Sequence, residues 1–152
     1  MPENVMVKNN SMKRYLGIDP GEKHIGVAIS DPSGTISRPF CIIQHTSYQE
    51  SAEKIAGLCR EQEIGEIIIG VSQDEDGEAT FSGRKALRLG EALKNSISIP
   101  VQYWDETGTT RAAQQSRREM GVRRKHRQGH LDDVAACILL QSYLDFLCEH
   151  GV

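Results

Sequence analysis

The run Glu66–Val71, with the sequence EIIIGV, constrains the fold more than any other segment of the chain. Its apolar residues follow one another without alternation, which is typical of a strand that is buried on both faces of a sheet. Such strands belong to sheets with helices on both sides. Residues 48–62 and 81–94, before and after this run, repeat their apolar side chains at helical intervals. The segment therefore predicts an α/β fold.

Three short segments near the N-terminus predict an antiparallel meander. Residues 14–19, 25–30 and 35–43 are strand-like, and the turns between them contain Asp-Pro-Gly and Asp-Pro-Ser-Gly. Pro39 lies within the third segment, and it indicates an edge strand or a bulge, because proline cannot donate to a sheet ladder. Thr46 or Ser47 is expected to cap the helix that follows.

The second half of the chain adds a strand at 101–104 and helices at 109–120 and 131–147. Right-handed crossovers would place the fourth and fifth strands beside the first, at the centre of a five-stranded mixed sheet flanked by helices. A chain of 152 residues fits one domain. We expect that domain to span residues 13–148, after a flexible polar tail at residues 1–12.

Carboxylates follow three of the predicted strands, at the edge where open sheets of this kind place their sites. They are Asp19 after the first strand, the acids of loop 72–78 after the fourth, and Asp105 and Glu106 after the fifth. Two further acids, Asp132 and Asp133, stand at the start of the last helix. Converging carboxylates repel one another unless a cation or protons intervene. Oxygen ligands suit Mg²⁺ or Mn²⁺, and two such ions can hold the attacking and leaving oxygens of a phosphodiester. The pattern favours a metal-dependent nuclease.

Each acid taken alone also has a purely structural interpretation. Asp19 can form the Asp-Pro-Gly turn, and Asp132 can cap the last helix. Glu106 and the acids of the loop can be solvated surface groups. The hypothesis therefore depends on the constellation and not on any single member.

The basic residues are concentrated in one strip. The chain has a net charge of −3, yet residues 117–127 contain six Arg or Lys and one Glu. The strip can be a solvated loop near a helix C-terminus, or it can contact the phosphates of a nucleic acid. It contains no aromatic residue, so base stacking on it is not expected. The candidate nucleic-acid contacts are Lys23, Arg117, Arg118, Arg123, Arg124, Lys125 and Arg127.

The cysteines and the apolar runs bear on location. Cys41, Cys59, Cys137 and Cys148 show no C-x-x-C spacing, and each lies in or beside an apolar segment. We expect buried, reduced thiols, which fits a cytoplasmic protein. No apolar run approaches the length of a membrane span, and the N-terminus lacks a signal-peptide pattern.

Four segments in order resemble the bacterial YqgF/RuvX family: LGIDPGEKHIGVAISDPSG, EIIIGVSQDEDG, VQYWDETGTT and HLDDVAACILLQSYL. The similarity extends from about Lys13 to Asp145. It implies a ribonuclease H-like fold and a metal-dependent nuclease that matures the 5′ end of pre-16S ribosomal RNA. Resolution of Holliday junctions is an older proposal for such proteins.

The resemblance also implies roles for individual residues. The family's first Asp matches Asp19, its catalytic Glu matches Glu106, and the Asp that heads the last helix matches Asp132. These three residues would be both catalytic and metal-ligating. Asp133 is a neighbour that could substitute or assist, although adjacent helical residues point about 100° apart.

Two departures from the family pattern bear on substrate preference. The usual G-L-P-L-N-x-D-G loop has lost its proline and gained acids at residues 70–77. The Arg of the family's D-E-R segment is Thr107 in this chain. The three predicted metal ligands are unaffected by either change.

Three functions follow as hypotheses. The first is a cytoplasmic nuclease that uses Mg²⁺ or Mn²⁺, with two ions expected, and acts on structured RNA as a monomer or weak homodimer. The second is a DNA junction resolvase, which needs a symmetric dimer to coordinate two cuts. The third is a ribosome assembly factor that binds nucleic acid without cutting it.

Overall fold

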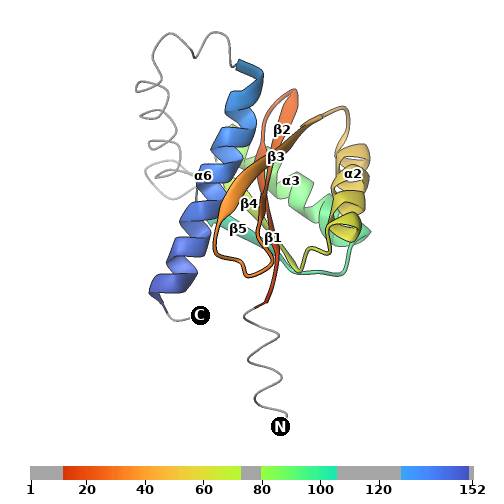
Figure 1. Cartoon of the computed structure of the whole chain (residues 1–152). Coiled ribbons are helices and arrows are strands. Elements are labelled where there is room, and N and C mark those ends of the chain that lie inside the picture. The colour runs from red at the N-terminus through yellow and green to blue at the C-terminus, as the bar shows by residue number, and fades with distance from the viewer. Residues whose placement is uncertain (1–11, 73–79, 106–127, 151–152) are drawn as a thin grey trace.

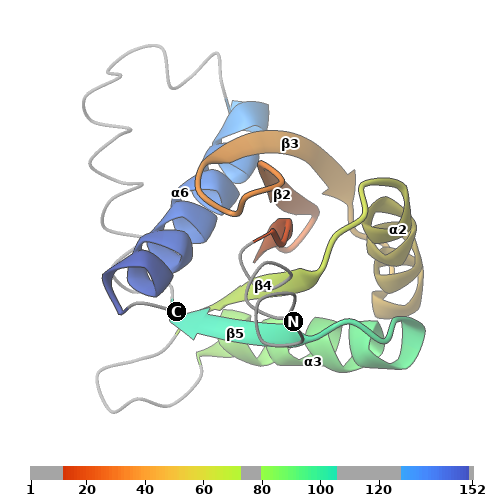
Figure 2. The same cartoon turned by 60° about the horizontal axis from the view of Figure 1, so that its bottom comes forward.

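The computed structural model describes residues 12–72, 80–105 and 128–150, and it contains one five-stranded sheet between two layers of helices (Figures 1 and 2). The elements are β1 (Tyr15–Pro20), β2 (His24–Ser30), β3 (Ser37–Gln44), α2 (Tyr48–Glu61), β4 (Glu66–Val71), α3 (Phe81–Ser96), β5 (Val101–Asp105) and α6 (Gln128–Glu149). The predicted helix at 109–120 and residues 1–11 of the predicted tail lie outside the described residues.

The sheet is mixed, in the order β3-β2-β1-β4-β5. The pairs β1–β2 and β2–β3 are antiparallel, whereas β1–β4 and β4–β5 are parallel. This arrangement confirms both the predicted meander and the predicted central place of β1. Right-handed crossovers bring β4 to the free edge of β1 and then β5 to the free edge of β4, so the fifth strand lies beside the fourth and not beside the first.

The segment β4 is buried along its whole length, as its unbroken apolar sequence predicts. Its side chains alternate between two cores: Ile67 and Ile69 pack with the residues beneath α2 and α3, and Ile68 packs with the residues beneath α6. The same division runs through the whole sheet, so that α2 and α3 cover one face and α6 covers the other (Figure 2).

Gly17 brings α6 unusually close to β1. A Cβ atom built on Gly17 would lie 2.7 Å from Cβ of Leu140 and 3.3 Å from the carbonyl oxygen of Ala136. The helix therefore rests directly on the backbone of the central strand, and any larger residue at this position would push it away. This contact fixes the height of α6 above the sheet.

Local signals in the sequence are also confirmed. Ser47 is the N-cap of α2, where its side chain accepts a hydrogen bond from the backbone N–H of Glu50. Pro39 lies in the edge strand β3, next to a shift in register against β2. No helix of the described part of the chain is long and apolar enough to cross a membrane.

The cysteine prediction is only partly right. All four cysteines are free thiols, as expected. Cys59 is buried, and burial raises its pKa to about 12. Cys41 and Cys137, however, are half-buried, and Cys148 is exposed. The periodicity of α6 continues into its last turn, where most side chains face solvent, so apolar neighbours in sequence did not imply burial there.

Candidate functional site

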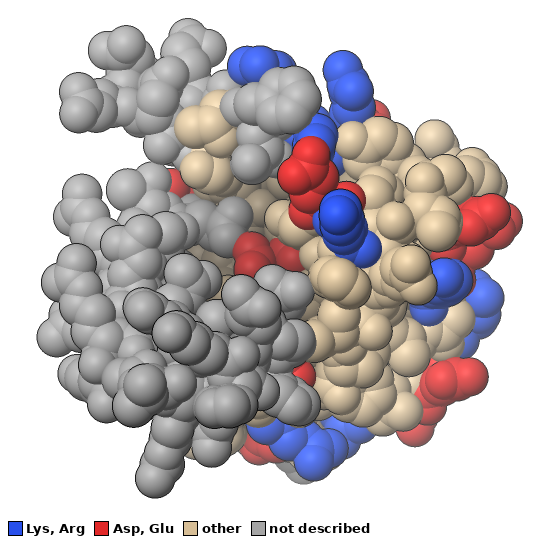
Figure 3. All heavy atoms as spheres, turned by 90° about the horizontal axis from the view of Figure 1, so that it is seen from above, with Lys and Arg blue, Asp and Glu red and all other residues tan. Residues whose placement is uncertain are grey.

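The carboxyl ends of β1, β4 and β5 lie at the same end of the sheet, because the three strands are parallel neighbours. The helix α6 runs in the opposite direction to β1 and begins at this end (Figure 1). Figure 3 looks onto this end of the molecule, where acidic side chains gather near the middle, next to undescribed residues. The structure thus brings the end of the central strand and the start of the last helix together.

Asp19 lies on the face of the sheet that α6 covers. Along β1, Tyr15 packs in the core beneath α6 and Leu16 packs in the opposite core, so Gly17 and Asp19 share the face of Tyr15. Asp19 is half-buried and lies about 7 Å beyond Gly17 along the strand. Position 132 lies about one turn, or about 6 Å, before Ala136, whose carbonyl oxygen lies close to Gly17. The candidate carboxylate of β1 is therefore close to the first described turns of α6.

The helical phase of α6 separates the two adjacent acids at its start. Viewed along the helix axis, position 132 is rotated by about 20° from Tyr143. The hydroxyl of Tyr143 donates a hydrogen bond to Glu66 of β4. Asp133 lies about 40° from Cys137, which accepts a hydrogen bond from Ser37 of β3. Position 132 therefore belongs to the side of the helix on which β4 lies, and Asp133 to the side of β3.

The pKa of Cys41 supports this placement of Asp133. Burial raises the pKa of this β3 thiol, and the nearby carboxylate of Asp133 raises it further. Asp133 is therefore close to the edge of the sheet formed by β3. The side chain of Asp132 lies outside the described part of the structure.

Asp105 does not share the face of Asp19. In the parallel ladder, Gly70 pairs with Trp104, and Val71 pairs with Asp105. Trp104 packs in the core beneath α6, whereas Val71 belongs to the core beneath α2 and α3. The exposed Asp105 thus belongs to the α2 and α3 face, although its place at the end of β5 agrees with the sequence.

Most of the remaining predicted site residues lie outside the residues that the structure describes. Among the described residues, no group of three or more His, Cys, Asp and Glu side chains could hold a metal ion. Glu106 and Thr107 lie outside the described residues, as do 73–79 of the acidic loop. So do the candidate nucleic-acid contacts Arg117, Arg118, Arg123, Arg124, Lys125 and Arg127, whereas Lys23 is described and lies exposed in the turn between β1 and β2. The three-acid site stays a prediction.

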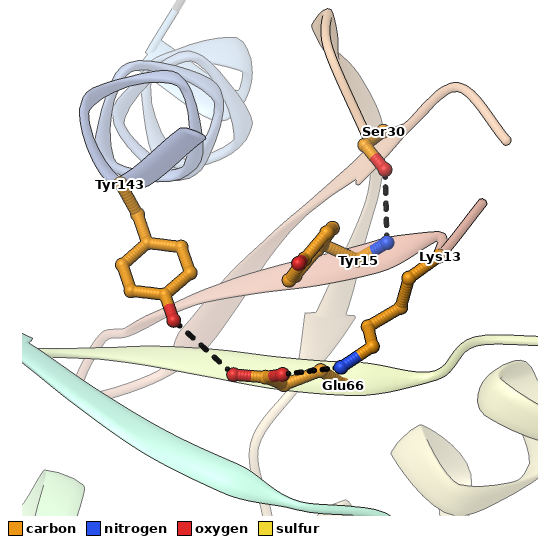
Figure 4. A network of polar contacts seen from close by, with 5 residues as sticks. All are labelled: Lys13, Tyr15, Ser30, Glu66 and Tyr143. Carbon is orange, nitrogen blue, oxygen red and sulfur yellow. Dashed lines mark hydrogen bonds and ion pairs between the residues drawn. The ribbon is translucent and has the colours of Figure 1, made fainter. Parts of the chain in front are cut away.

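A second carboxylate, Glu66, holds α6 at the opposite end of the sheet (Figure 4). Its side chain is 9% exposed, lies 3.1 Å from the Lys13 ammonium and accepts a hydrogen bond of 3.2 Å from the hydroxyl of Tyr143. Burial, followed by the proximity of Glu66, raises the pKa of Tyr143. Because Tyr143 is on α6, this network fixes the position of the helix along the sheet.

Gly17 and Glu66 are two residues whose importance the sequence alone does not reveal. Gly17 stands in the segment LGIDPG, directly before the candidate acid, but a glycine in a strand gives no sign of which helix will approach it. From the sequence, Glu66 is simply the first residue of a predicted strand. A charged residue that opens a strand buried on both faces was the available signal, because such a charge needs a partner.

The comparisons with known proteins decide the family. A family model described as "RuvX: Holliday junction resolvase" matches residues 13–146. The chain belongs to the RuvX family. The match covers every described strand and almost all of α6, and it confirms the resemblance that the four sequence segments carry.

Curated RuvX relatives cover nearly the same length. A protein of Thermoanaerobacter pseudethanolicus, provisionally named pre-16S rRNA nuclease, is 41% identical over 133 residues, which cover 87% of this chain and 96% of that protein. One from Clostridium acetobutylicum with the same name is 36% identical, over 87% of this chain and 98% of its own. One from Syntrophus aciditrophicus is 35% identical over 91% and 93%.

Solved structures show the same fold at low sequence identity. The Thermus thermophilus RuvC in complex with a Holliday junction substrate superposes with a TM-score of 0.58 at 16% identity, over 92% of this chain and 97% of that chain. The Fowlpox virus Holliday junction resolvase superposes with a TM-score of 0.52 at 16% identity, over 88% and 99%. The ribonuclease H-like fold is therefore confirmed for this RuvX chain.

Proposed function

We propose that this protein is a Mg²⁺- or Mn²⁺-dependent nuclease that hydrolyses phosphodiester bonds in structured RNA, at the 5′ end of pre-16S ribosomal RNA in the cytoplasm. The observation that carries the proposal is the position of Asp19. This acid ends the central strand on the face that α6 covers, next to the first turns of that helix, in a chain whose RuvX relatives are named for this reaction.

We propose Asp19, Glu106 and Asp132 as the ligands. The alternation of β5 supports Glu106 in preference to Asp105, because a strand continued by one residue returns to the face of Trp104 and Asp19. Two strand spacings, about 10 Å, separate the β1 and β5 backbones. The phase of α6 supports Asp132 in preference to Asp133, since position 132 belongs to the side of the helix on which β4 lies.

The chemistry of these donors fits a hard divalent cation. All three proposed ligands are carboxylates, which Mg²⁺ and Mn²⁺ prefer over the thiolate and imidazole groups that select zinc. Two ions held there would supply the Lewis-acid stabilisation of charge that phosphodiester hydrolysis requires. The role of Asp19, Glu106 and Asp132 is to hold and orient that charge at the end of the sheet, while Gly17 keeps α6 close enough for Asp132 to take part.

The RuvX family model favours a second candidate function, because its description is that of a Holliday junction resolvase. A resolvase cuts two strands symmetrically, so it needs a dimer with two sites. Light scattering of the purified protein together with cleavage of a four-way DNA junction tests this candidate. A monomer that cuts precursor RNA but leaves the junction intact would exclude it.

Cleavage of a radiolabelled precursor RNA that contains the 5′ end of 16S rRNA tests the main proposal. Wild-type protein should cut it in the presence of Mg²⁺, and excess EDTA should abolish cutting. Asp19→Asn should be inactive, whereas Asp133→Asn, a matched loss of one carboxylate on the same surface, should keep most of its activity. Equal cleavage by Asp19→Asn and wild type would refute the assignment. RNA binding without any cleavage would instead favour a non-catalytic assembly factor.

A further inference from the structure

We propose that the first half of α3 forms a second surface for the nucleic-acid backbone, made by Arg84, Lys85 and Arg88 together with Lys23. We name these four residues the α3 cation surface. The proposal rests on the proposed function and deepens it, because it states which way the substrate leaves the candidate site.

The composition of α3 is strongly one-sided. The helix contains four basic residues and one Glu, in a chain with a net charge of −3, and its first turn has no acid. Arg84 and Arg88 are exposed, and the i, i+4 spacing places them on the same stripe of the helix. The opposite stripe, which includes Leu89 and Leu93, is buried against the sheet. The cations therefore do not contribute to the apolar core.

The α3 cation surface starts beside the candidate site. Because α3 follows β4, its N-terminal half lies at the carboxyl end of the parallel strands. The ammonium of Lys85 lies 3.8 Å from the carboxylate of Glu22, and Lys85 lines one small hollow together with Pro20 and Gly21. Pro20 directly follows Asp19. The turn between β1 and β2 thus connects the candidate acid on the α6 face with the cations on the α3 face.

The space-filling view supports this path. Figure 3 shows Lys and Arg side chains between the acidic centre of this end and the rim of the molecule, on the described side. The arginine-rich strip at 117–127 lies outside the described residues, so it does not account for these cations. A strand or duplex seated at Asp19 would pass over the turn that contains Lys23 and reach Lys85 next.

The charges of this surface do not favour the helix that carries them. Positive charge near a helix N-terminus is unfavourable because it meets the positive end of the helix dipole, and like charges at i, i+4 repel. The ion pair between Lys85 and Glu22 is worth little, since Glu22 is 81% exposed. A phosphate backbone, in contrast, gains from each cation because its counterions are released. The polyanion is the partner that this surface fits.

The test is binding of a fluorescein-labelled RNA hairpin with a single-stranded 5′ extension, measured by anisotropy in EDTA so that no cleavage occurs. The substitutions Arg84→Gln, Lys85→Gln and Arg88→Gln are combined. The matched control combines Arg38→Gln, Lys54→Gln and Arg60→Gln, which remove the same charge from exposed positions on β3 and α2. A third protein carries Arg84→Lys and Arg88→Lys, and circular dichroism melting checks that all three fold. A DNA hairpin of the same sequence forms a parallel arm.

We expect the α3 variant to bind the RNA at least about tenfold more weakly, with a salt slope smaller by about 2 to 3. The control and the Lys variants should bind like wild type. An equal loss in the control would show that only net charge matters, and it would overturn the proposal, as would unchanged binding of the α3 variant or no binding by wild type. Because binding is measured without metal, a wild type that binds but never cuts would refute only the nuclease proposal. The DNA arm shows whether the surface reads RNA or any phosphate backbone.

Discussion

The carboxylates near the two ends of α6, Glu66 and Asp19, have different surroundings. Near the C-terminal half of α6, Glu66 of β4 is buried and contacts both the ammonium of Lys13 and the hydroxyl of Tyr143 (Figure 4). Near the N-terminal end of α6, Asp19 is half-buried, and Asp133 of the helix lies near Cys41 of β3. Glu66 is enclosed with its partners, whereas the acids that we propose to gather around Asp19 would need a bound cation to offset their repulsion. The contrast separates a structural carboxylate, Glu66, from Asp19, which we propose as a metal ligand.

The largest effect is expected from Asp19. Asp19→Asn should lower the rate of RNA cleavage by about a thousandfold, because a lost carboxylate ligand removes several kcal/mol of transition-state stabilisation. The melting temperature should change little by comparison, because the substitution keeps the size of the side chain. Single-turnover cleavage assays and calorimetry of the same samples check both statements. A large loss of stability would place Asp19 with the structural carboxylates.

Glu66→Ala should show the reverse. We expect the free energy of unfolding to fall by about 2 kcal/mol, because the hydroxyl of the half-buried Tyr143 loses its partner, while Lys13 is partly exposed and can be hydrated. Tyr143→Phe removes only one hydrogen bond and should cost about 1 kcal/mol. Urea unfolding measures both. Cleavage per folded molecule should stay near the wild-type value. A loss as large as that of Asp19→Asn would show that Glu66 also contributes to activity and would contradict the contrast.

Gly17→Ala is expected to have a moderate effect on both stability and metal-dependent cleavage. Its methyl group would meet Leu140 at 2.7 Å, and moving the helix away should cost about 1–3 kcal/mol of stability. The same displacement should raise the Mg²⁺ concentration needed for half-maximal cleavage by about tenfold, as seen when residues that orient metal ligands are lost. Gly57→Ala, in α2 with open space around its position, is the matched control: it should leave the Mg²⁺ requirement unchanged and should not lower stability, because Ala favours a helix more than Gly does.

The smallest effect concerns Asp31, in the turn between β2 and β3. Hydrogen bonds from the backbone N–H of Ile36 and the hydroxyl of Ser33 lower the pKa of Asp31 from 3.8 to about 2. Because the folded pKa is the lower one, this stabilisation is present above pH 4 and is lost as the pH falls towards 2. Asp31→Asn should therefore unfold more easily than wild type at pH 6, and the difference should shrink at pH 2. A constant difference at both pH values would contradict this account.

Much of the fold was predictable because its signals are local. The unbroken run of β4, the Asp-Pro turns of the meander and the cap at Ser47 depend on residues within a few positions of one another. Even the order of the sheet follows, since the handedness of crossovers leaves few alternatives. The relation to the RuvX family was also readable, because four motifs stand in the family order along most of the chain.

The faces of the acids were not predictable in the same way. Val101, Tyr103 and Trp104 are all apolar, so the sequence of β5 does not show which side of the strand Asp105 takes. Only the pairing of Val71 with Asp105 assigns it to the α2 and α3 face. Similarly, Asp132 and Asp133 are equivalent in sequence, and the packing of α6 against β3 and β4 distinguishes their positions.

The sequence by itself determined the elements, their order and the family, because helix and strand periods are properties of neighbouring residues. Three contacts are visible only in the tertiary structure. The helix α6 packs against Gly17, and Glu66 contacts Lys13 and Tyr143. Lys85 lies next to the turn that follows Asp19. Each of these contacts joins residues that are far apart along the chain. Their meeting depends on strand register and on the rotation of a helix about its axis, which are set when the two faces of the sheet are packed together.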